Sequence, residues 1–228
     1  RQGLKLLVKA GGHYGLPVIV EILDPSLVGL YEDEGVNCLQ IGEPNSRNTI
    51  LLERLRRTKL PVLHKRSTTA DAIDFLLWTE QMMVDGKENI ILCERGIKGV
   101  NEKTTTRNTL DLGSVAKFYY ELTGLPIAVD ASHGTGIRNL VHPMCLAGLM
   151  AGASALLIET HINPLIAKSD GEQSLFPEQF RNLCEAARIT WEARRKTEKL
   201  YSPSELLEEA YEERRKEDSE RFFGRANG

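Results

Sequence analysis

The chain has 228 residues and a formal net charge of −3, and 41% of its residues are hydrophobic and 27% charged. These proportions are those of an ordinary soluble globular protein, and they leave room for one large domain or two small ones. A nearly neutral charge gives no reason to expect a nucleic-acid partner. The sequence shows neither an apolar stretch of membrane-spanning length nor a signal-peptide pattern, so we expect a cytoplasmic protein without membrane contact.

Six short apolar runs, most of them rich in Val, Ile and Leu, are predicted to be strands. They cover residues 16–23, 36–42, 60–66, 89–96, 125–133 and 154–161. Most show no strict alternation of apolar and polar residues, which is typical of strands buried on both faces in a parallel sheet.

Amphipathic segments between these runs predict helices. A helix-like segment from Gly3 to Gly12 comes first, and the others cover residues 25–34, 46–57, 69–85, 111–122 and 138–151. In the segment 69–85 we expect the apolar side chains Ala72, Ile73, Leu76, Leu77 and Met83 to face the core. The alternation predicts parallel βα units. Two architectures remain open: a doubly wound open sheet, or a (β/α)8 barrel that lacks its first two strands.

The composition changes at Arg188, after which Glu, Arg and Lys become dense. We therefore predict an α/β domain over residues 1–187 and a charged helical tail over 188–228. Residues 202–205, Ser-Pro-Ser-Glu, form a capping box that predicts a helix start in the tail. We expect this helix to pack on one side of the domain; the alternative is a partner-binding or oligomerisation helix.

The chain contains four cysteines that lie far apart in the sequence, Cys38, Cys93, Cys145 and Cys184. Three of them lie inside apolar runs. We predict buried free thiols in a reducing compartment rather than disulfides or a cysteine-only metal site.

Polar residues stand at the end of every predicted strand, where parallel α/β proteins bind their ligands. They are Glu21, Gln40, Lys65, Arg66, Glu94, Arg95, Asp130, His133, Glu159 and His161, and Gly42 accompanies Gln40. Lys65 and Arg95 are cations at adjacent strand ends and together predict a site for phosphate or carboxylate. The alternative is that they form salt bridges with Glu94 or Glu159.

A candidate metal site consists of His133, Glu159 and Asp170. His133 and Glu159 end apolar runs, and Asp170 lies in a loop between Ser169 and Gly171. One imidazole and two carboxylates suit a divalent Mn, Fe, Co or Zn ion. The glycines after His133 favour a tight turn there. A structural hydrogen-bonding role is the alternative for His133.

Several motifs together resemble those of the type I beta 3-deoxy-7-phosphoheptulonate synthases, which are related to the 3-deoxy-8-phosphooctulonate synthases. The resemblance covers about residues 3–187 and is carried by LQIG, HKR, ILCERGI, TRNTLDL, VDASHGTG, LVHPM and SDGEQSL. It implies a metal-dependent (β/α)8 barrel that condenses phosphoenolpyruvate with erythrose 4-phosphate in the shikimate pathway of aromatic amino acid biosynthesis.

The resemblance also implies roles for individual residues. Lys65 would contact the carboxylate end of phosphoenolpyruvate, and Arg95 would hold its phosphate. His133, Glu159 and Asp170 would bind the divalent metal. On this basis the predicted catalytic residues are Lys65, Arg95 and His133, and the predicted substrate-binding residues are Lys65, Arg66, Arg95, Gly42 and Asp170.

The chain departs from the family pattern at several places. We find no equivalent of the two leading strands, with their metal-binding Cys and Lys-Pro-Arg-Thr segment; Cys93 stands elsewhere and does not replace that Cys. The usual Gly-Ala-Arg-Asn is Gly-Glu-Pro-Asn at residues 42–45, and the usual Lys-Arg-Gly is Lys-Arg-Ser at 65–67.

Two hypotheses fit these departures: a fragment of a longer enzyme, or a diverged paralogue that binds ligands or subunits without catalysis. The proline at position 44 favours divergence. An incomplete barrel leaves a sheet edge and apolar faces open, so we predict a homo-oligomer and low solubility in isolation.

Overall fold

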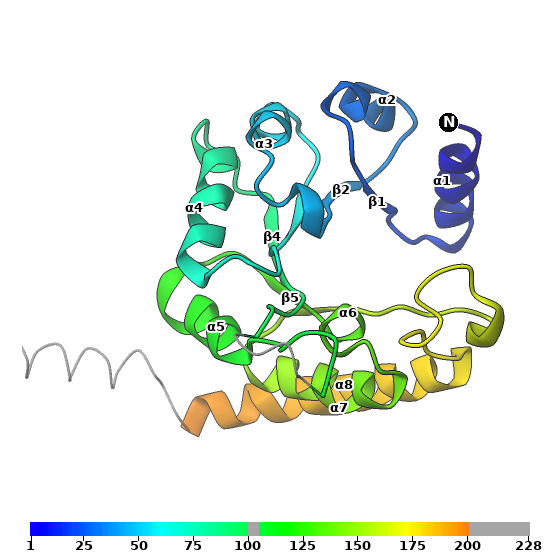
Figure 1. The fold of residues 1–228 in the computed structure, drawn as a ribbon, viewed down its shortest axis with the longest axis vertical. Helices are drawn as coiled ribbons and strands as arrows, with labels where there is room; N and C mark the ends of the chain where they lie inside the picture. The colour runs from blue at the N-terminus through cyan, green and yellow to red at the C-terminus, as the bar shows by residue number, and fades with distance from the viewer. Residues whose placement is uncertain (100–104, 201–228) are drawn as a thin grey trace, which may run out of the picture.

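The structure is a computed structural model that describes residues 1–99 and 105–200. In these two ranges, six parallel strands form one sheet in the order β1-β2-β3-β4-β5-β6, so each strand pairs with the next along the chain. The strands are β1 (Ile19–Glu21), β2 (Cys38–Ile41), β3 (Val62–Lys65), β4 (Ile90–Glu94), β5 (Ile127–Asp130) and β6 (Ala155–Leu157). An order without reversal excludes the doubly wound alternative, and the sheet curls into an incomplete (β/α)8 barrel (Figure 1).

Helices follow the strands and lie around the outside of the curled sheet (Figure 1). The α-helices are α1 (Gln2–Tyr14), α2 (Val28–Asp33), α3 (Thr49–Arg56), α4 (Ala72–Met83), α5 (Leu112–Lys117), α6 (Ala131–Thr135), α7 (Arg138–Met150) and α8 (Pro177–Thr197). Short turns of 3-10 helix are η1 (Pro25–Leu27), η2 (Glu43–Asn45), η4 (Pro164–Ile166) and η5 (Glu198–Leu200), and η3 (Phe118–Leu122) is a π-helical turn. Asn48, Asp71 and Asp111 cap α3, α4 and α5 by accepting a backbone N–H of the first turn.

The main core lies between the sheet and the outer helices. Leu39 and Val62 of the sheet pack with Leu51 and Leu55 of α3, and all four are fully buried. Because neighbouring side chains of a strand face opposite sides, the other residues face the inside of the curl. A small cluster of Cys38, Leu63, Cys93 and Ala128 lies there. This alternation decides which polar strand ends point into the mouth of the barrel.

Three expectations about local structure need correction. Residues 131–135, predicted as the end of a strand and a turn, form helix α6, because the Asp130 side chain caps it and Gly136 ends it with φ 68°. In α4, Ile73 and Leu77 are 54% and 51% exposed, because the helix instead buries Phe75, Thr79 and Met82. All four cysteines are free, but Cys184 is exposed on α8.

Helix α8 passes through the predicted boundary at residues 187 and 188 without a break. Beyond that point Arg194 is 2% exposed, and its Nη1 donates to the carbonyl oxygens of Leu149 and Ala153 at 2.6 and 2.8 Å. The start of the tail therefore packs on α7 and the segment after it. The predicted capping box at 202–205 lies outside the described residues, and the division into domains stays a prediction.

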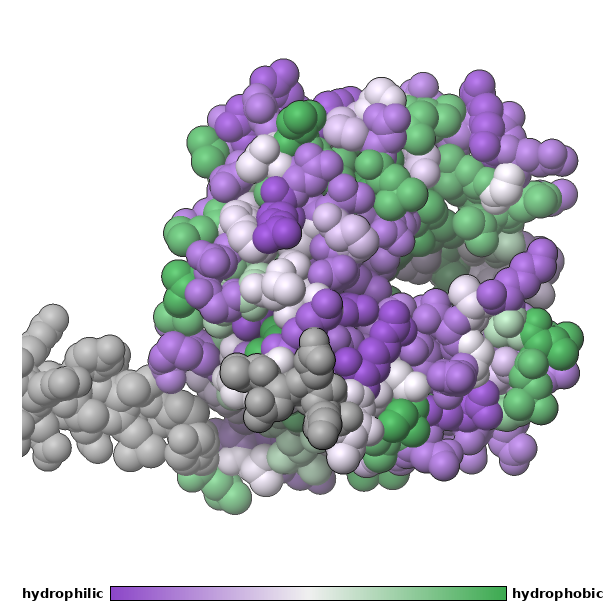
Figure 2. Space-filling model, viewed as in Figure 1, coloured by the Kyte–Doolittle hydropathy of each residue, from purple (hydrophilic) through white to green (hydrophobic). Residues whose placement is uncertain are grey.

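The sheet is not closed between β1 and β6 within the described residues. Figure 2 shows a hollow on this side of the molecule with hydrophobic surface beside it. Exposed apolar side chains of this region include Leu6, Leu16 and Ile19, which are 62%, 64% and 44% exposed. None of the helices in the described part of the chain has the length and apolar character needed to cross a membrane.

Candidate functional site

A buried ion pair joins the ends of β3 and β5 at the inner side of the sheet. Lys65 Nζ lies 2.9 Å from Asp130 Oδ2, and the two side chains are 8% and 1% exposed. Burial alone would raise the pKa of Asp130, but the hydrogen bonds from His133 and the charge of Lys65 outweigh it and hold the pKa below its ordinary value. Asp130 is therefore ionised and acts only as an acceptor.

The same carboxylate fixes the ring of His133. His133 Nδ1 lies 2.8 Å from Asp130 Oδ2, and the His133 backbone N–H donates to Asp130 Oδ1 at 3.0 Å. Because the ionised carboxylate can only accept, Nδ1–H is the donor in this contact. The tautomer with its proton on Nδ1 keeps a lone pair on Nε2, which is the arrangement found where a carboxylate orients a metal-binding histidine.

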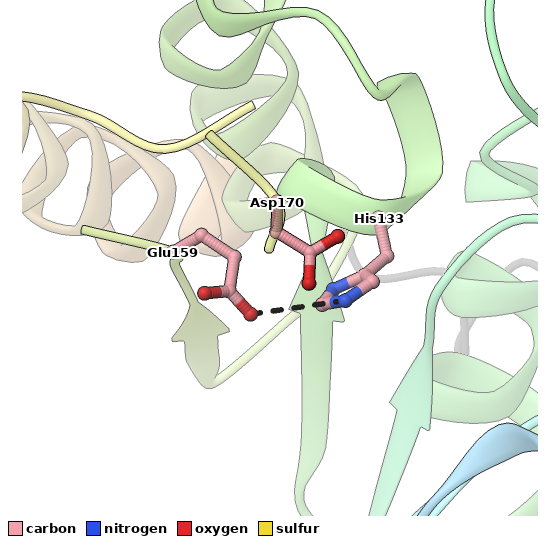
Figure 3. Close-up of side chains that lie close together, drawn as sticks. All are labelled: His133, Glu159 and Asp170. Carbon is pink, nitrogen blue, oxygen red and sulfur yellow. Dashed lines mark ion pairs between the residues drawn. The ribbon is translucent and has the colours of Figure 1, made fainter. Parts of the chain in front are cut away.

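His133, Glu159 and Asp170 come together as predicted. Ligand atoms of the three side chains all lie within 4.8 Å of one another, and His133 Nε2 is 3.7 Å from Glu159 Oε1. Figure 3 shows the ring and the two carboxylates pointing toward one region. An unprotonated imidazole nitrogen beside two carboxylates fits a divalent transition metal. The three residues thus form a candidate metal site.

The loop that carries Asp170 is held in an uncommon conformation. Asp170 has φ 53°, the left-handed region, and is the one non-glycine residue with positive φ in the described ranges. Its Oδ1 accepts from Gln173 Nε2 at 2.9 Å and lies 3.5 Å from Arg107 Nη1. These contacts fix the carboxylate toward His133.

Arg95 follows β4 and is 7% exposed, and its Nε has no hydrogen-bond partner among the described residues. The charge of Arg95 acts on the Glu43 carboxylate. Burial raises the pKa of Glu43, but the hydrogen bonds from Thr68 and Ser67 and the charge of Arg95 outweigh burial and hold the pKa below its usual range. A buried guanidinium without a partner at Nε is a candidate for anion binding.

Arg66 follows Lys65, the last residue of β3, and faces the opposite way. It is 2% exposed, its Nη1 contacts Glu94 Oε2 at 2.9 Å and Asp111 Oδ2 at 3.0 Å, and its Nε donates to the Ala70 carbonyl. Successive strand residues point to opposite faces, which explains the difference. Arg66 therefore lies among buried partners and away from Lys65, and the salt bridge to Glu94 that we considered for Lys65 or Arg95 belongs to Arg66.

Gly42 lies at the end of β2 and is buried. A Cβ at this position would lie 1.8 Å from Glu21 Oε1, so the glycine permits the close approach of the Glu21 side chain. His161, the last polar strand-end residue, accepts at Nδ1 from the Asn163 backbone and belongs to the following turn.

Sequence reasoning missed three contributors to this edge. Asp130 was one polar strand end among many, although its position three residues before His133 is a usable signal, since it allows a helix N-cap. In the sequence, Glu43 stands out only as part of the Gly-Glu-Pro-Asn departure from the family pattern. Arg107 stands out only as part of the motif TRNTLDL. Contacts between distant segments give these residues their positions, and one sequence does not reveal such contacts.

Taken together, the fold and the carboxyl-end cluster define an incomplete (β/α)8 barrel whose candidate site lies at the carboxyl ends of its strands. The chain belongs to the DAHP synthetase I family, whose model matches residues 1–199. This confirms the family resemblance seen in the sequence.

Named relatives agree with this assignment. A phospho-2-dehydro-3-deoxyheptonate aldolase of Thermotoga maritima is 40% identical over 185 residues, which cover 80% of this chain and 53% of that protein. A 2-dehydro-3-deoxyphosphooctonate aldolase of Acidithiobacillus ferrooxidans is 29% identical over 75% of this chain and 62% of its own length. The chain thus spans about half of the length of the first relative.

Solved structures match as well. The truncated form of 3-deoxy-D-arabino-heptulosonate 7-phosphate synthase from Thermotoga maritima superposes with a TM-score of 0.79 at 37% identity. The match covers 84% of this chain and 72% of that one.

Proposed function

We propose that this chain provides the metal-binding and phosphoenolpyruvate-binding part of a 3-deoxy-7-phosphoheptulonate synthase, which condenses phosphoenolpyruvate with erythrose 4-phosphate. The convergence of His133, Glu159 and Asp170 beside the buried Lys65 carries the proposal. Family membership supports the reaction type. Exposed apolar residues beside the open sheet edge support a homo-oligomer, and we retain the cytoplasm as its location.

The charge of each residue determines which ligand group it would bind. His133, Glu159 and Asp170 would hold a divalent Mn, Fe, Co or Zn ion, which when bound polarises the aldehyde carbonyl. Lys65 offers a point charge to the carboxylate of phosphoenolpyruvate, and the Arg95 guanidinium matches its phosphate.

The reaction balances without an additional redox partner. The methylene carbon of phosphoenolpyruvate forms a bond to the aldehyde carbon, and the aldehyde oxygen becomes a hydroxyl. Water supplies the hydroxyl that adds to the carbon bearing the phosphate and the proton that balances the aldehyde oxygen. The C–O bond to phosphate then breaks, which leaves a ketone and free phosphate. Lys65 and Arg95 keep the two negative groups of the enol phosphate apart and oriented during these steps.

A second candidate is a diverged relative that binds an anionic ligand or another subunit without turnover. One observation favours it: the charge of Arg95 already acts on the Glu43 carboxylate and lowers its pKa, so an anionic substrate at Arg95 would meet a negative charge. The two candidates differ in catalysis rather than in metal binding.

The test measures Mn²⁺ binding by equilibrium dialysis and then condensation with both substrates. We expect His133→Ala to weaken Mn²⁺ binding at least about 100-fold, because one of three ligands is lost. His13→Ala, which removes an exposed histidine of α1, should leave binding unchanged. Equal Mn²⁺ binding in all three proteins would refute the metal site. Tight binding without turnover would support the second candidate.

A further inference from the structure

The loops after β2, β3 and β4 place several hydrogen-bond donors around one oxygen atom. Glu43 Oε1 accepts from the Ser67 hydroxyl at 3.1 Å, from the Thr68 backbone N–H at 3.0 Å and from the Thr68 hydroxyl at 3.0 Å. A carboxylate oxygen that accepts three such bonds is held as the oxygen of a bound ion would be.

These donors are fixed before any ligand arrives. Ser67 and Thr68 are 5% and 8% exposed, so their polar groups need a partner inside the protein or a bound ion. The Ser67 hydroxyl accepts the Thr69 backbone N–H at 3.5 Å, which leaves its own proton for Glu43. The Thr68 carbonyl accepts from the Lys98 backbone N–H at 2.8 Å, which ties the loops after β3 and β4 together.

Arg95 brings a positive charge close to Ser67. Lys65 pairs with Cys93 between β3 and β4, and the Arg66 backbone N–H donates to the Cys93 carbonyl at 2.9 Å, so Ser67 and Arg95 stand at matching positions two residues further along. Arg95 is 7% exposed, its Nε lacks a partner in the described part of the chain, and its charge lowers the pKa of Glu43. Two hydroxyls, one backbone N–H and a guanidinium are the groups that bind tetrahedral oxyanions. Glu43 satisfies the first three and leaves Arg95 Nε without a hydrogen bond.

We propose that Ser67, Thr68 and Arg95 form a binding site for a phosphate-type oxyanion, and that Glu43 occupies this site from within the chain. An external oxyanion then binds only by displacing the Glu43 side chain. Displacement is possible because Glu43 lies in the short turn η2 and is only partly buried. The inference rests on the proposed function for the phosphate-binding role of Arg95; the occupation of the site by Glu43 is the new element, and it does not depend on the metal cluster.

Calorimetric titration with inorganic phosphate tests the proposal at constant ionic strength, with acetate and chloride as separate titrants. Glu43→Ala should bind phosphate at least about tenfold tighter than the unchanged chain, the amount expected from one hydrogen bond to a charged group. Adding Thr68→Val should remove the gain. Equal phosphate affinity in Glu43→Ala and the unchanged chain would overturn the proposal, as would a gain for acetate without one for phosphate.

A matched control removes a different carboxylate that accepts from a threonine hydroxyl. Glu32 accepts from Thr58 on the outer side of the fold, so Glu32→Ala should leave phosphate binding as it was. An equal gain in Glu32→Ala would show a general charge effect and overturn the site.

Two further variants keep the test decisive. If Glu43→Ala does not fold, Glu43→Gln retains an acceptor oxygen without the charge and should bind phosphate about threefold tighter; no gain there overturns the proposal. The double variant His133→Ala/Glu43→Ala should keep the gain of Glu43→Ala. Failure of the metal site would then leave the oxyanion site standing, and loss of the gain would refute the claimed independence.

Discussion

Two corners of the barrel mouth contain charged groups, but they satisfy those groups differently. At the end of β5 and β6, His133, Glu159 and Asp170 gather lone pairs and negative charge around one point. At the ends of β2, β3 and β4, the negative charge of Glu43 already meets donors from the neighbouring loops. The first corner needs a cation to balance it, and the second is largely balanced by the chain itself. Ligand affinity at each corner therefore depends on which existing contacts the ligand has to displace.

The largest expected effect concerns the buried ion pair of Arg66 with Glu94. Arg66 directly precedes Ser67, which donates to Glu43. Arg66→Met removes the partner of the buried Glu94 carboxylate. Burial already raises the pKa of Glu94, even though the charge of Arg66 acts to lower it. Leaving that charge unpaired should lower the free energy of unfolding by about 3–5 kcal/mol. Urea denaturation checks this.

The control for Arg66 is an exposed ion pair. Arg57→Met breaks the contact with Glu53 at 3.3 Å and should cost less than about 1 kcal/mol. Equal losses in the two variants would mean that the buried pair does not stabilise this corner, and the contrast between the corners would weaken.

An effect of pH follows from His64, which is fully buried on β3 and bonded to the Ser46 carbonyl. Burial lowers the pKa of His64 to about 4 from 6.5. Between these values the unfolded chain binds a proton that the folded chain excludes, so stability falls as the pH drops from about 6.5 to 4. The contribution is on the order of 3 kcal/mol. Comparing urea curves of the unchanged chain and His64→Gln at pH 7 and 4.5 isolates it; parallel pH dependence would contradict the assignment.

The smallest of these effects tests Asp130, which contacts both Lys65 and His133. Asp130→Asn keeps a cap for α6 but weakens the hold on the His133 proton, so Mn²⁺ affinity should fall about 10–100-fold. Asp71→Asn changes the equivalent cap of α4 and should leave Mn²⁺ affinity unchanged. Unchanged Mn²⁺ binding in Asp130→Asn would show that Asp130 does not support the metal site.

Much of the fold follows from the sequence because its signals are local. Apolar runs and amphipathic periods predict six strands in chain order, and the structure confirms them with shorter ends. The orientation of α4 was missed because Ile73 and Leu77 resemble core residues when only periodicity is considered. Packing against the sheet, which decides which stripe is buried, is not local.

The candidate site, like the fold, could be predicted from the sequence only in part. Residue type and strand ends were enough to predict that His133, Glu159 and Asp170 converge. They were not enough to separate Lys65 from Arg66, because that distinction depends on where the strand pleat places each side chain. The partnership of Glu43 with Ser67 and Thr68 joins two loops about 25 residues apart, and nothing in the spacing indicates it.

Asp130 Oδ2 serves Lys65 and His133 at once, at 2.9 and 2.8 Å. An anion that draws the ammonium toward itself leaves more electron density for the imidazole, and a cation on the imidazole makes Asp130 a weaker partner for the ammonium. Occupancy on one side is thus thermodynamically linked to occupancy on the other, and the linkage is reciprocal. The order in which the two species are added should change the rate of assembly but leave the final saturation the same.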